Sequence, residues 1–374
     1  MFDARYFDAL DLGGVFAKVM AGERLDLEDG QRLFACPDIH ALGALAHHVR
    51  TRLHGDAAFY VLNRHVNYTN VCVNGCTFCA FSRKRDDQDG AFRLGLADIE
   101  ARLEQAGDCA EVHIVGGCHP GLRLDFFETV LRRVKELLPG VALKAFTAVE
   151  IAHFAALEGM TTREVLAVLQ RAGLDMLPGG GAEIFDPGVR TRICPEKADA
   201  ATWLRVHGEA HGLGMRTNAT MLYGHVETTD HRLAHLDALR RQQDATGGFV
   251  CFIPLPFLVQ NNALGLEGTR GAHSGLDDLR TMAVSRLMLD NIPHLKAYWV
   301  MHSVKLAQAM LHYGADDLDG TVVEEKIGHM AGAESDQALT RAELTAMIRA
   351  AGFAPVQRDA FFNPVSAPDQ QAGR

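Results

Sequence analysis

The sequence predicts an α/β protein built around a (β/α)8 barrel of the TIM type, with an N-terminal helical extension and a C-terminal helix. Between residues 59 and 327, short apolar runs alternate about eight times with amphipathic stretches of helical period. Glycines such as Gly173, Gly214 and Gly314 follow the last periodic residue of several stretches, as expected at helix ends. This alternation within one domain favours a parallel barrel, whose active site lies at the carboxyl ends of the strands.

The barrel is expected to occupy residues 59–327. Its fourth strand is short, so an incomplete barrel is the alternative. The strand candidates are Phe59–Val66, Glu111–Val115, Ala142–Thr147, Met176–Leu177, Arg216–Leu222, Phe249–Pro254, Leu295–Val300 and Gly320–Val323. The helix candidates are Leu96–Ala106, Phe126–Leu138, Thr162–Ala172, Ala200–Gly212, Asp230–Ala245, Leu276–Asn291 and Val304–Tyr313.

Two shorter segments flank the barrel. Residues 1–58 read as helices, because apolar residues recur there at helical spacing and Gly22 and Pro37 break the pattern. Residues 328–374 are expected to form one helix, opened by the capping box Thr340-x-x-Glu343, and then a flexible tail. The polar, proline-bearing residues after position 363 predict disorder.

Composition limits the function. The 374 residues are 48% apolar and 22% charged, which is ordinary for a soluble globular protein. The net charge of −10 argues against a nucleic-acid partner, for which a basic face is expected. No apolar run is long enough to span a membrane, and eight cysteines without a disulfide-like arrangement suit a reducing compartment. We therefore expect a cytoplasmic protein with neither a nucleic-acid nor a membrane partner.

One short loop carries the strongest chemical signal. Cys72, Cys76 and Cys79 are spaced C-x3-C-x2-C, and the next cysteine is Cys109. Three thiolates in one loop can hold three irons of a [4Fe–4S] cluster and leave the fourth iron open to a ligand. A structural zinc site needs four ligands, usually supplied as two separated pairs. A cluster with an odd number of cysteines does not suit a disulfide framework. The cluster interpretation is favoured.

Residues that follow the predicted strands are candidates for the active site. Gly116 and Gly117 allow close approach of the backbone to a ligand, although a tight turn is the alternative. Glu150 and Glu183 can accept hydrogen bonds from ribose hydroxyls, or else cap the helices that follow them.

The fifth and later strands supply further polar candidates. Asn218, Tyr223 and His225 are placed to orient a polar substrate or to move a proton, although a lone histidine is more often a satisfied polar residue. Arg286 is a cation among apolar neighbours, suited to a substrate carboxylate or to a protein acid. The segment LGLEGTRG is expected to be a loop that closes over the substrate.

The stretch CVNGCTFC resembles the CxxxCxΦC motif of radical S-adenosylmethionine (SAM) enzymes, with Phe78 as the aromatic residue. This resemblance implies that SAM chelates the open iron and is cleaved to methionine and a 5′-deoxyadenosyl radical. It also implies that Gly116 and Gly117 hold the methionine amino group, and that Glu183, with Glu150 and Asn218 as further candidates, contacts SAM.

Longer stretches narrow the resemblance. NYTNVCVNGCTFCAFSR, KAFTAVEI, PGGGAEIF, NATMLYGHVET and GADDLDGTVVEEK resemble the aminofutalosine synthase family of the futalosine route to menaquinone. The implied reaction joins the deoxyadenosyl group to 3-[(1-carboxyvinyl)oxy]benzoate, with rearrangement and decarboxylation, so that SAM is consumed. Reduced flavodoxin or ferredoxin is the implied electron donor, and a homodimer is possible.

The substrate has two carboxylates, so cations and polar groups should line its pocket. The candidates are Lys144, Thr147, Arg216, Tyr223 and Arg286. Two alternatives stay open. One is another radical SAM reaction, such as that of the sister cyclic dehypoxanthinyl futalosine synthase or of the deazaflavin-cofactor synthases. The other is a non-catalytic iron–sulfur or zinc module, which predicts no cleavage of SAM.

Overall fold

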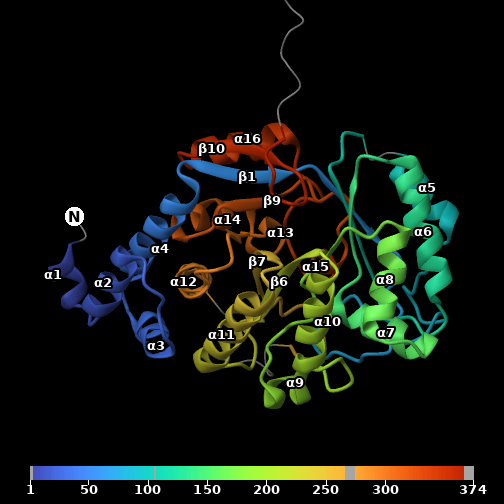
Figure 1. Ribbon diagram of the computed structural model, residues 1–374, viewed down its shortest axis with the longest axis horizontal. Coiled ribbons are helices and arrows are strands. Elements are labelled where there is room, and N and C mark those ends of the chain that lie inside the picture. Colours follow the sequence, from blue (N-terminus) through green and yellow to red (C-terminus); the bar gives the residue numbers. More distant parts are fainter. Residues whose placement is uncertain (1–2, 105–106, 266–273, 366–374) are drawn as a thin grey trace, which may run out of the picture.

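The computed structural model describes residues 3–104, 107–265 and 274–365. Its centre is a parallel sheet of seven strands that follow one another in chain order. Helices cover the outside of this sheet, and in Figure 1 they form an arc around β6 and β7. The strands are β2 (Asn63–Asn67), β3 (Glu111–Val115), β4 (Ala142–Ala145), β5 (Met176–Leu177), β6 (Arg216–Tyr223), β7 (Phe249–Pro256) and β8 (His294–Leu295). The predicted class, a (β/α) barrel of the TIM type, is confirmed.

The helices between the strands have the expected start and stop signals. Thr147 with Glu150 and Thr161 with Glu164 form capping boxes, and Gly173 ends a helix in the left-handed conformation. The helices between β2 and β8 are α5 (Leu96–Leu103), α6 (Leu124–Leu137), α7 (Ala148–Glu158), α8 (Thr162–Ala172), α9 (Pro187–Ile193), α10 (Ala200–Gly212), α11 (Thr229–Thr246) and α12 (Gly275–Met288).

The eighth position of the barrel is irregular. The segment 316–323 lies between the two edges of the sheet and is joined to them by single bridges, Lys296 with Asp317 and Val323 with Arg64. The N–H of Ala297 donates to the carbonyl oxygen of Asp317 at 2.8 Å, and the N–H of His65 donates to that of Val323 at 2.9 Å. The barrel is therefore closed by a bent connection and not by a full strand at the predicted Gly320–Val323.

A second, three-stranded parallel sheet holds the order β10–β1–β9. Its strands are β1 (Ala57–Val61), β9 (Asp317–Gly320) and β10 (Ala354–Arg358). The predicted strand Phe59–Val66 is thus two strands in different sheets, separated at Leu62. In Figure 1, β10, β1 and α16 lie together at the top of the molecule. The sequence analysis did not predict β10.

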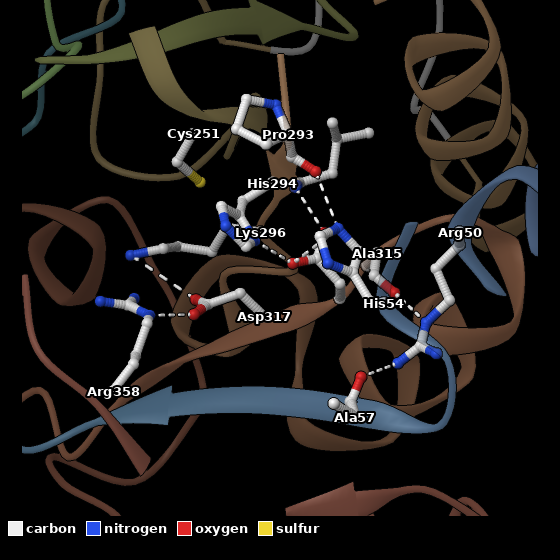
Figure 2. Close-up of polar contacts among 12 residues, drawn as sticks. Arg50, His54, Ala57, Cys251, Pro293, His294, Lys296, Ala315, Asp317 and Arg358 are labelled. Atoms are coloured by element: carbon white, nitrogen blue, oxygen red, sulfur yellow. Dashed lines mark hydrogen bonds and ion pairs between the residues drawn. The ribbon is translucent and has the colours of Figure 1, made fainter. Parts of the chain in front are cut away.

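The N-terminal extension is helical, as predicted, with α1 (Ala4–Asp8), α2 (Gly13–Ala21), α3 (Leu27–Ala35) and α4 (Ile39–His54). α3 and α4 contact α11 and α12. Arg50 near the end of α4 is fully buried and donates to the carbonyl oxygens of Ala57 (Figure 2) and of Gly55 (2.6 Å). It also lies 4.1 Å from the ring centroid of Phe353. This cation ties the extension to β1 and to the C-terminal segment.

The chain after β8 continues with α13 (Trp299–His302), α14 (Val304–Met310), the 3-10 turn η1 (Leu311–Tyr313), α15 (Ile327–Met330) and α16 (Arg341–Ala350). The capping box Thr340–Glu343 begins α16, as predicted. The expected disordered tail lies mostly outside the described residues, and so does most of the predicted LGLEGTRG loop. Within the described parts of the chain, no helix combines the length and the apolar character needed to cross a membrane.

Candidate active site

A cavity of about 330 Å³ lies at the carboxyl ends of the barrel strands and reaches down into the barrel. The loop after β2 contributes its three motif cysteines, and the turn after β3 contributes Gly116 and Gly117. The other predicted site residues that line the cavity are Phe78, Lys144, Thr147, Glu150, Glu183 and Asn218. The expectation that the site lies at the strand ends agrees with this geometry.

The cysteine loop is held in place by backbone hydrogen bonds. The N–H of Cys72 donates to the carbonyl oxygen of Arg83 at 2.8 Å, and the N–H of Thr77 donates to that of Ile193 at 2.9 Å. Cys72, Cys76 and Cys79 are free, partly buried thiols. Burial raises the pKa of Cys76 to about 12 and also raises that of Cys79, whereas a hydrogen bond with Cys118 lowers the pKa of Cys72. A bound cation would favour the thiolate form of Cys76 and Cys79, which their burial opposes.

The glycine pair packs directly against the cysteine loop. A Cβ on Gly117 would lie 2.2 Å from the carbonyl oxygen of Val71, and one on Gly116 would lie 2.8 Å from the ring of Tyr68. The N–H of Gly117 donates to the carbonyl oxygen of Thr69 at 2.9 Å. Only glycine fits at position 117, because any side chain would push the loop that carries Cys72.

Glu150 joins that turn to α7. Its Oε1 accepts from the N–H of Gly116 at 3.0 Å and from the Tyr68 hydroxyl at 2.7 Å. Its Oε2 accepts from the N–H and the hydroxyl of Thr147 at 2.8 and 2.7 Å. Burial nevertheless raises the pKa of Glu150 to about 7. Four donors use the acceptor capacity of the carboxylate, so Glu150 acts as a cap and holds the glycine turn.

Glu183 faces Lys197 across the cavity wall. Glu183 is buried in a left-handed conformation (φ +47°), and its carboxylate pairs with the ammonium of Lys197. Burial opposes ionisation of Glu183, but the Lys197 ammonium holds the pKa of this carboxyl below its usual value. Lys197 Nζ also lies 5.4 Å from the ring centroid of Phe78. The sequence analysis missed Lys197, because nothing in its local sequence marks a contact with a residue fourteen positions earlier.

Asn218 and Thr220 lie two residues apart on β6, so both side chains point into the barrel. Thr220 donates to the carbonyl oxygen of Gly179 at 2.6 Å. The Oδ1 atom of Asn218 is buried and has no hydrogen-bond partner among the described residues. An unsatisfied acceptor in a cavity wall is suited to a hydroxyl or amino group of a ligand.

Two predicted site residues on β6 and just after it lie outside the cavity. Tyr223 donates to Asp278 Oδ1 at 2.6 Å, because its odd position on β6 turns it outward toward α12. His225 lies against Glu227 (Nδ1 to Oε2, 3.2 Å) and the carbonyl oxygen of Leu222 (2.9 Å). Burial lowers the pKa of His225, so the ring is a neutral, satisfied polar group. The predictions of a substrate contact for Tyr223 and a catalytic role for His225 are not supported by this geometry.

The two predicted arginines are also absent from the cavity lining. Arg216 is exposed at the amino end of β6 and donates to the carbonyl oxygen of Gly247 at 2.9 Å. Arg286 is fully buried and pairs with Asp316 (Nη2 to Oδ1, 2.6 Å). The geometry does not support either prediction of a substrate contact, because Arg216 begins its strand at the opposite end of the barrel and Arg286 already has a protein acid.

The same end of the barrel holds a group with the composition of a metal site. His54, His294 and Asp316 offer ligand atoms that lie within 4.8 Å of one another. Figure 2 shows His54 and His294 in this cluster. His294 Nδ1 lies 2.6 Å from Asp316 Oδ2, and His54 Nε2 lies 2.9 Å from the carbonyl oxygen of Pro293. Because the Arg286 cation also contacts Asp316, we assign this cluster a structural role.

The comparisons with known proteins agree with this site. Residues 66–239 match the family model of the radical SAM superfamily, and residues 246–371 match the model described as the CofH/MqnC C-terminal region. An aminodeoxyfutalosine synthase from Thermus thermophilus is 47% identical over 94% of this chain and 95% of its own length. One from Streptomyces coelicolor is 45% identical over 91% of each chain.

A relative with another activity is also similar. The 5-amino-6-(D-ribitylamino)uracil–L-tyrosine 4-hydroxyphenyl transferase from Archaeoglobus fulgidus is 41% identical over 85% of this chain and 92% of its own length. Among solved structures, methylornithine synthase (PylB) has a TM-score of 0.73 at 17% identity, covering 91% of this chain and 96% of its own. The maturase HydG from Carboxydothermus hydrogenoformans has a TM-score of 0.70 at 16% identity, covering 94% and 80%. At these identities the two structures show the fold alone.

The chain belongs to the radical SAM superfamily and is an enzyme of that class. Within it, the full-length relatives include the aminodeoxyfutalosine synthases, so the resemblance drawn from the sequence motifs is confirmed. Membership implies a [4Fe–4S] cluster and SAM. The cavity fits both, since it combines three free thiols on one loop, a glycine turn that no side chain could occupy, and the unpartnered Oδ1 of Asn218.

Proposed function

We propose that this enzyme is an aminofutalosine synthase. It adds the 5′-deoxyadenosyl group of SAM to 3-[(1-carboxyvinyl)oxy]benzoate, with rearrangement and loss of carbon dioxide, to give 6-amino-6-deoxyfutalosine for menaquinone biosynthesis. The observation that carries the proposal is the 47% identity, over 94% of this chain, to a relative named aminodeoxyfutalosine synthase.

The residues that hold the cofactors follow from the cavity wall. Cys72, Cys76 and Cys79 bind three irons and leave the fourth iron to SAM. When bound, the cluster and SAM supply the 5′-deoxyadenosyl radical. Lys197, with Glu183, places an ammonium and a carboxylate beside the cysteine loop to orient the polar groups of SAM. Asn218 accepts a hydrogen bond from SAM through its unpartnered oxygen.

The cavity wall suits an aromatic substrate. Leu222, Ile253, Leu255, Phe257 and Met301 line it. These side chains offer an apolar surface to the substrate ring and exclude water from the vinyl group that reacts. Polar side chains lie deeper, where Lys144 lines the cavity and pairs with Glu111 at 2.5 Å.

A second candidate function is supported by the 41% identical relative from Archaeoglobus fulgidus, whose name specifies transfer of a 4-hydroxyphenyl group from tyrosine to a ribitylaminouracil. The sister cyclase is a third, since the resemblance of the cysteine loop extends to it. The hydroxyphenyl transfer and the cyclase reaction would both use the same cysteine loop to hold the cluster.

The test is an anaerobic assay of the reconstituted enzyme with dithionite, SAM and 3-[(1-carboxyvinyl)oxy]benzoate, followed by mass spectrometry. An adenosylated, decarboxylated adduct that is absent in Cys76→Ala supports the proposal. Free 5′-deoxyadenosine without adduct rejects it, and the same assay with tyrosine and the ribitylaminouracil, or with the cyclase substrate, then tests the other candidates.

The remaining partners are proposed on the same basis. Reduced flavodoxin or ferredoxin replaces dithionite as the electron donor in the cytoplasm, which the same assay tests with each purified protein. A homodimer is tested by light scattering of the loaded enzyme.

A further inference from the structure

The floor of the cavity is a row of polar side chains on neighbouring strands. His65 of β2 pairs in register with His113 of β3, and His113 pairs with Lys144 of β4. Residues paired in register point to the same side of a sheet, and all three line the cavity. Lys296, which follows β8, lines the same floor.

The two imidazoles lack hydrogen bonds that their burial requires. Their ring centroids are 4.6 Å apart in an edge-to-face arrangement. The Nε2 atoms of His65 and His113 are both buried without a partner among the described residues, and His65 as a whole is 5% exposed. An unsatisfied buried polar atom is destabilising, so two of them in one cavity indicate a ligand that supplies the partner.

The groups around the floor offer these atoms a role as hydrogen-bond donors, because the imidazoles are neutral and both nearby lysines are paired with acids. Burial lowers the pKa of both histidines, so each is neutral and can present an N–H without adding charge. Lys144 pairs with Glu111 (2.5 Å), which lies one layer deeper on β3. Lys296 pairs with Asp319 at 2.7 Å.

The acids near the floor already have partners. Asp319 and Glu325 line the cavity, but Asp319 is held by Lys296, and Glu325 accepts from the N–H groups of Ile327 (2.7 Å) and Gly328 (2.9 Å). The hydrogen-bond donors that the described floor offers to a ligand include the two imidazoles, with the ammonium groups of Lys144 and Lys296 beside them.

We propose that His65 and His113, supported by Lys144 and Lys296, form a carboxylate subsite that binds the benzoate carboxylate of the substrate. This inference rests on the proposed function, because that substrate carries a carboxylate on its ring. The vinyl carbon must react beside the cysteine loop, and the ring carboxylate then lies at the far end of the cavity. The apolar wall of Leu222, Ile253 and Leu255 is left for the ring between them.

The subsite can be tested without turnover. The probes are 3-methoxybenzoate and 3-methoxybenzamide, which differ only at the carboxylate, titrated calorimetrically into the enzyme loaded with oxidised cluster and SAM. The wild-type enzyme should bind the benzoate at least tenfold more tightly than the amide. His113→Phe, which keeps an aromatic ring but loses the N–H, should weaken benzoate binding about tenfold and leave amide binding unchanged, and His113→Gln should restore part of the loss.

His207→Phe is the matched control. His207 is a buried histidine on α10 whose two ring nitrogens also lack partners among the described residues, but it packs against Trp203 and lies outside the cavity lining. This variant should bind both probes like the wild type. Equal affinity for the two probes, or an unchanged preference in His113→Phe with normal iron content, overturns the proposal.

The turnover assay separates this proposal from the proposed function. If the wild-type enzyme prefers the benzoate but forms no adduct, the proposed subsite is supported and the proposed function is rejected. If both wild type and His113→Phe form the adduct with the same KM for the aromatic substrate, the proposed function is supported and the proposed subsite is rejected.

Discussion

Glu150 accepts a hydrogen bond from the backbone N–H of Gly116 at 3.0 Å, and so joins the first turn of α7 to the glycine turn beside the cysteine loop. The pKa of this carboxyl is raised by burial from 4.5 to about 7. A raised pKa in the folded state means that ionisation of Glu150 costs stability.

The first prediction concerns the pH dependence of that contact. Relative to Glu150→Gln, the wild-type free energy of unfolding should fall as the pH rises from about 5 to 8, by at most on the order of 3 kcal/mol. The stabilising contribution of the protonated form is complete below the ordinary pKa near 4.5 and is lost as the pH passes about 7. Urea unfolding of the cluster-free protein at several pH values measures the difference.

Glu164→Gln is the control for this prediction. Glu164 forms the same capping box with Thr161, but it is exposed, and hydrogen bonds from Thr161 lower its pKa. Its contribution is present above its ordinary pKa and lost as the pH falls, so the sign is opposite. If the Glu150 and Glu164 differences ran in the same direction with pH, the assignment of a raised pKa to Glu150 would be wrong.

The second prediction concerns the cluster ligands. Cys76→Ala should not retain the iron and the visible absorbance of a reconstituted [4Fe–4S] cluster, because one of three protein ligands is lost. Cys118→Ser should retain both, although Cys118 contacts Cys72 and accepts from Asn74 Nδ2 at 3.2 Å. Iron analysis and absorbance after anaerobic reconstitution decide it. If Cys118→Ser lost the cluster while Cys76→Ala retained it, Cys118 would be identified as a cluster ligand in place of Cys76.

The third prediction compares two residues of β6. Asn218→Ala should weaken SAM binding about tenfold, the effect of one lost hydrogen bond to a buried ligand group. Arg216→Ala should leave SAM affinity unchanged, because Arg216 lies exposed at the other end of the strand. Equilibrium dialysis with the reconstituted enzyme gives both dissociation constants, and an equal loss in the two variants would contradict a contact through Asn218.

The fourth prediction concerns the buried pair of Arg286 and Asp316. Arg286→Met should lower the free energy of unfolding by about 3–5 kcal/mol, because it leaves a buried carboxylate without its cation. The double variant with Asp316→Asn should recover part of this loss. Where the variant remains folded, its KM for the aromatic substrate should equal that of the wild type. A raised KM would indicate that Arg286 contacts the substrate.

Local patterns in the sequence predicted the features that depend on near neighbours. The spacing of Cys72, Cys76 and Cys79, the capping box at Thr161 and the alternation of strands and helices each involve residues close in the chain, so the cluster loop and the barrel could be predicted. The same holds for α16, whose first turn carries Thr340 and Glu343.

Features that depend on distant partners were missed. The run from Phe59 to Val66 is continuous in sequence, but its halves pair with different sheets, and only residues 317–320 and 354–358 decide that. The sequence also did not predict which face of β6 points into the barrel. The pairing of β6 with its neighbours places the side chain of Asn218 inside the barrel and that of Tyr223 outside it. One usable signal was overlooked. His65 and His113 are polar residues within predicted buried strands, and period-two spacing puts each on the same face as a further polar residue, Asn63 and Glu111.

The pairing of β1 also has a consequence for how the chain is synthesised. β1 lies between β9 and β10, and the register joins Ala57 to Ala354 and Val61 to Arg358. A ribosome adds about 5–20 residues per second, so this apolar segment leaves the exit tunnel long before either neighbour exists. Both of its edges stay open to other nascent chains during that interval. Protection by chaperones, and expression at a temperature that slows aggregation, therefore matter most for the earliest strand of this protein.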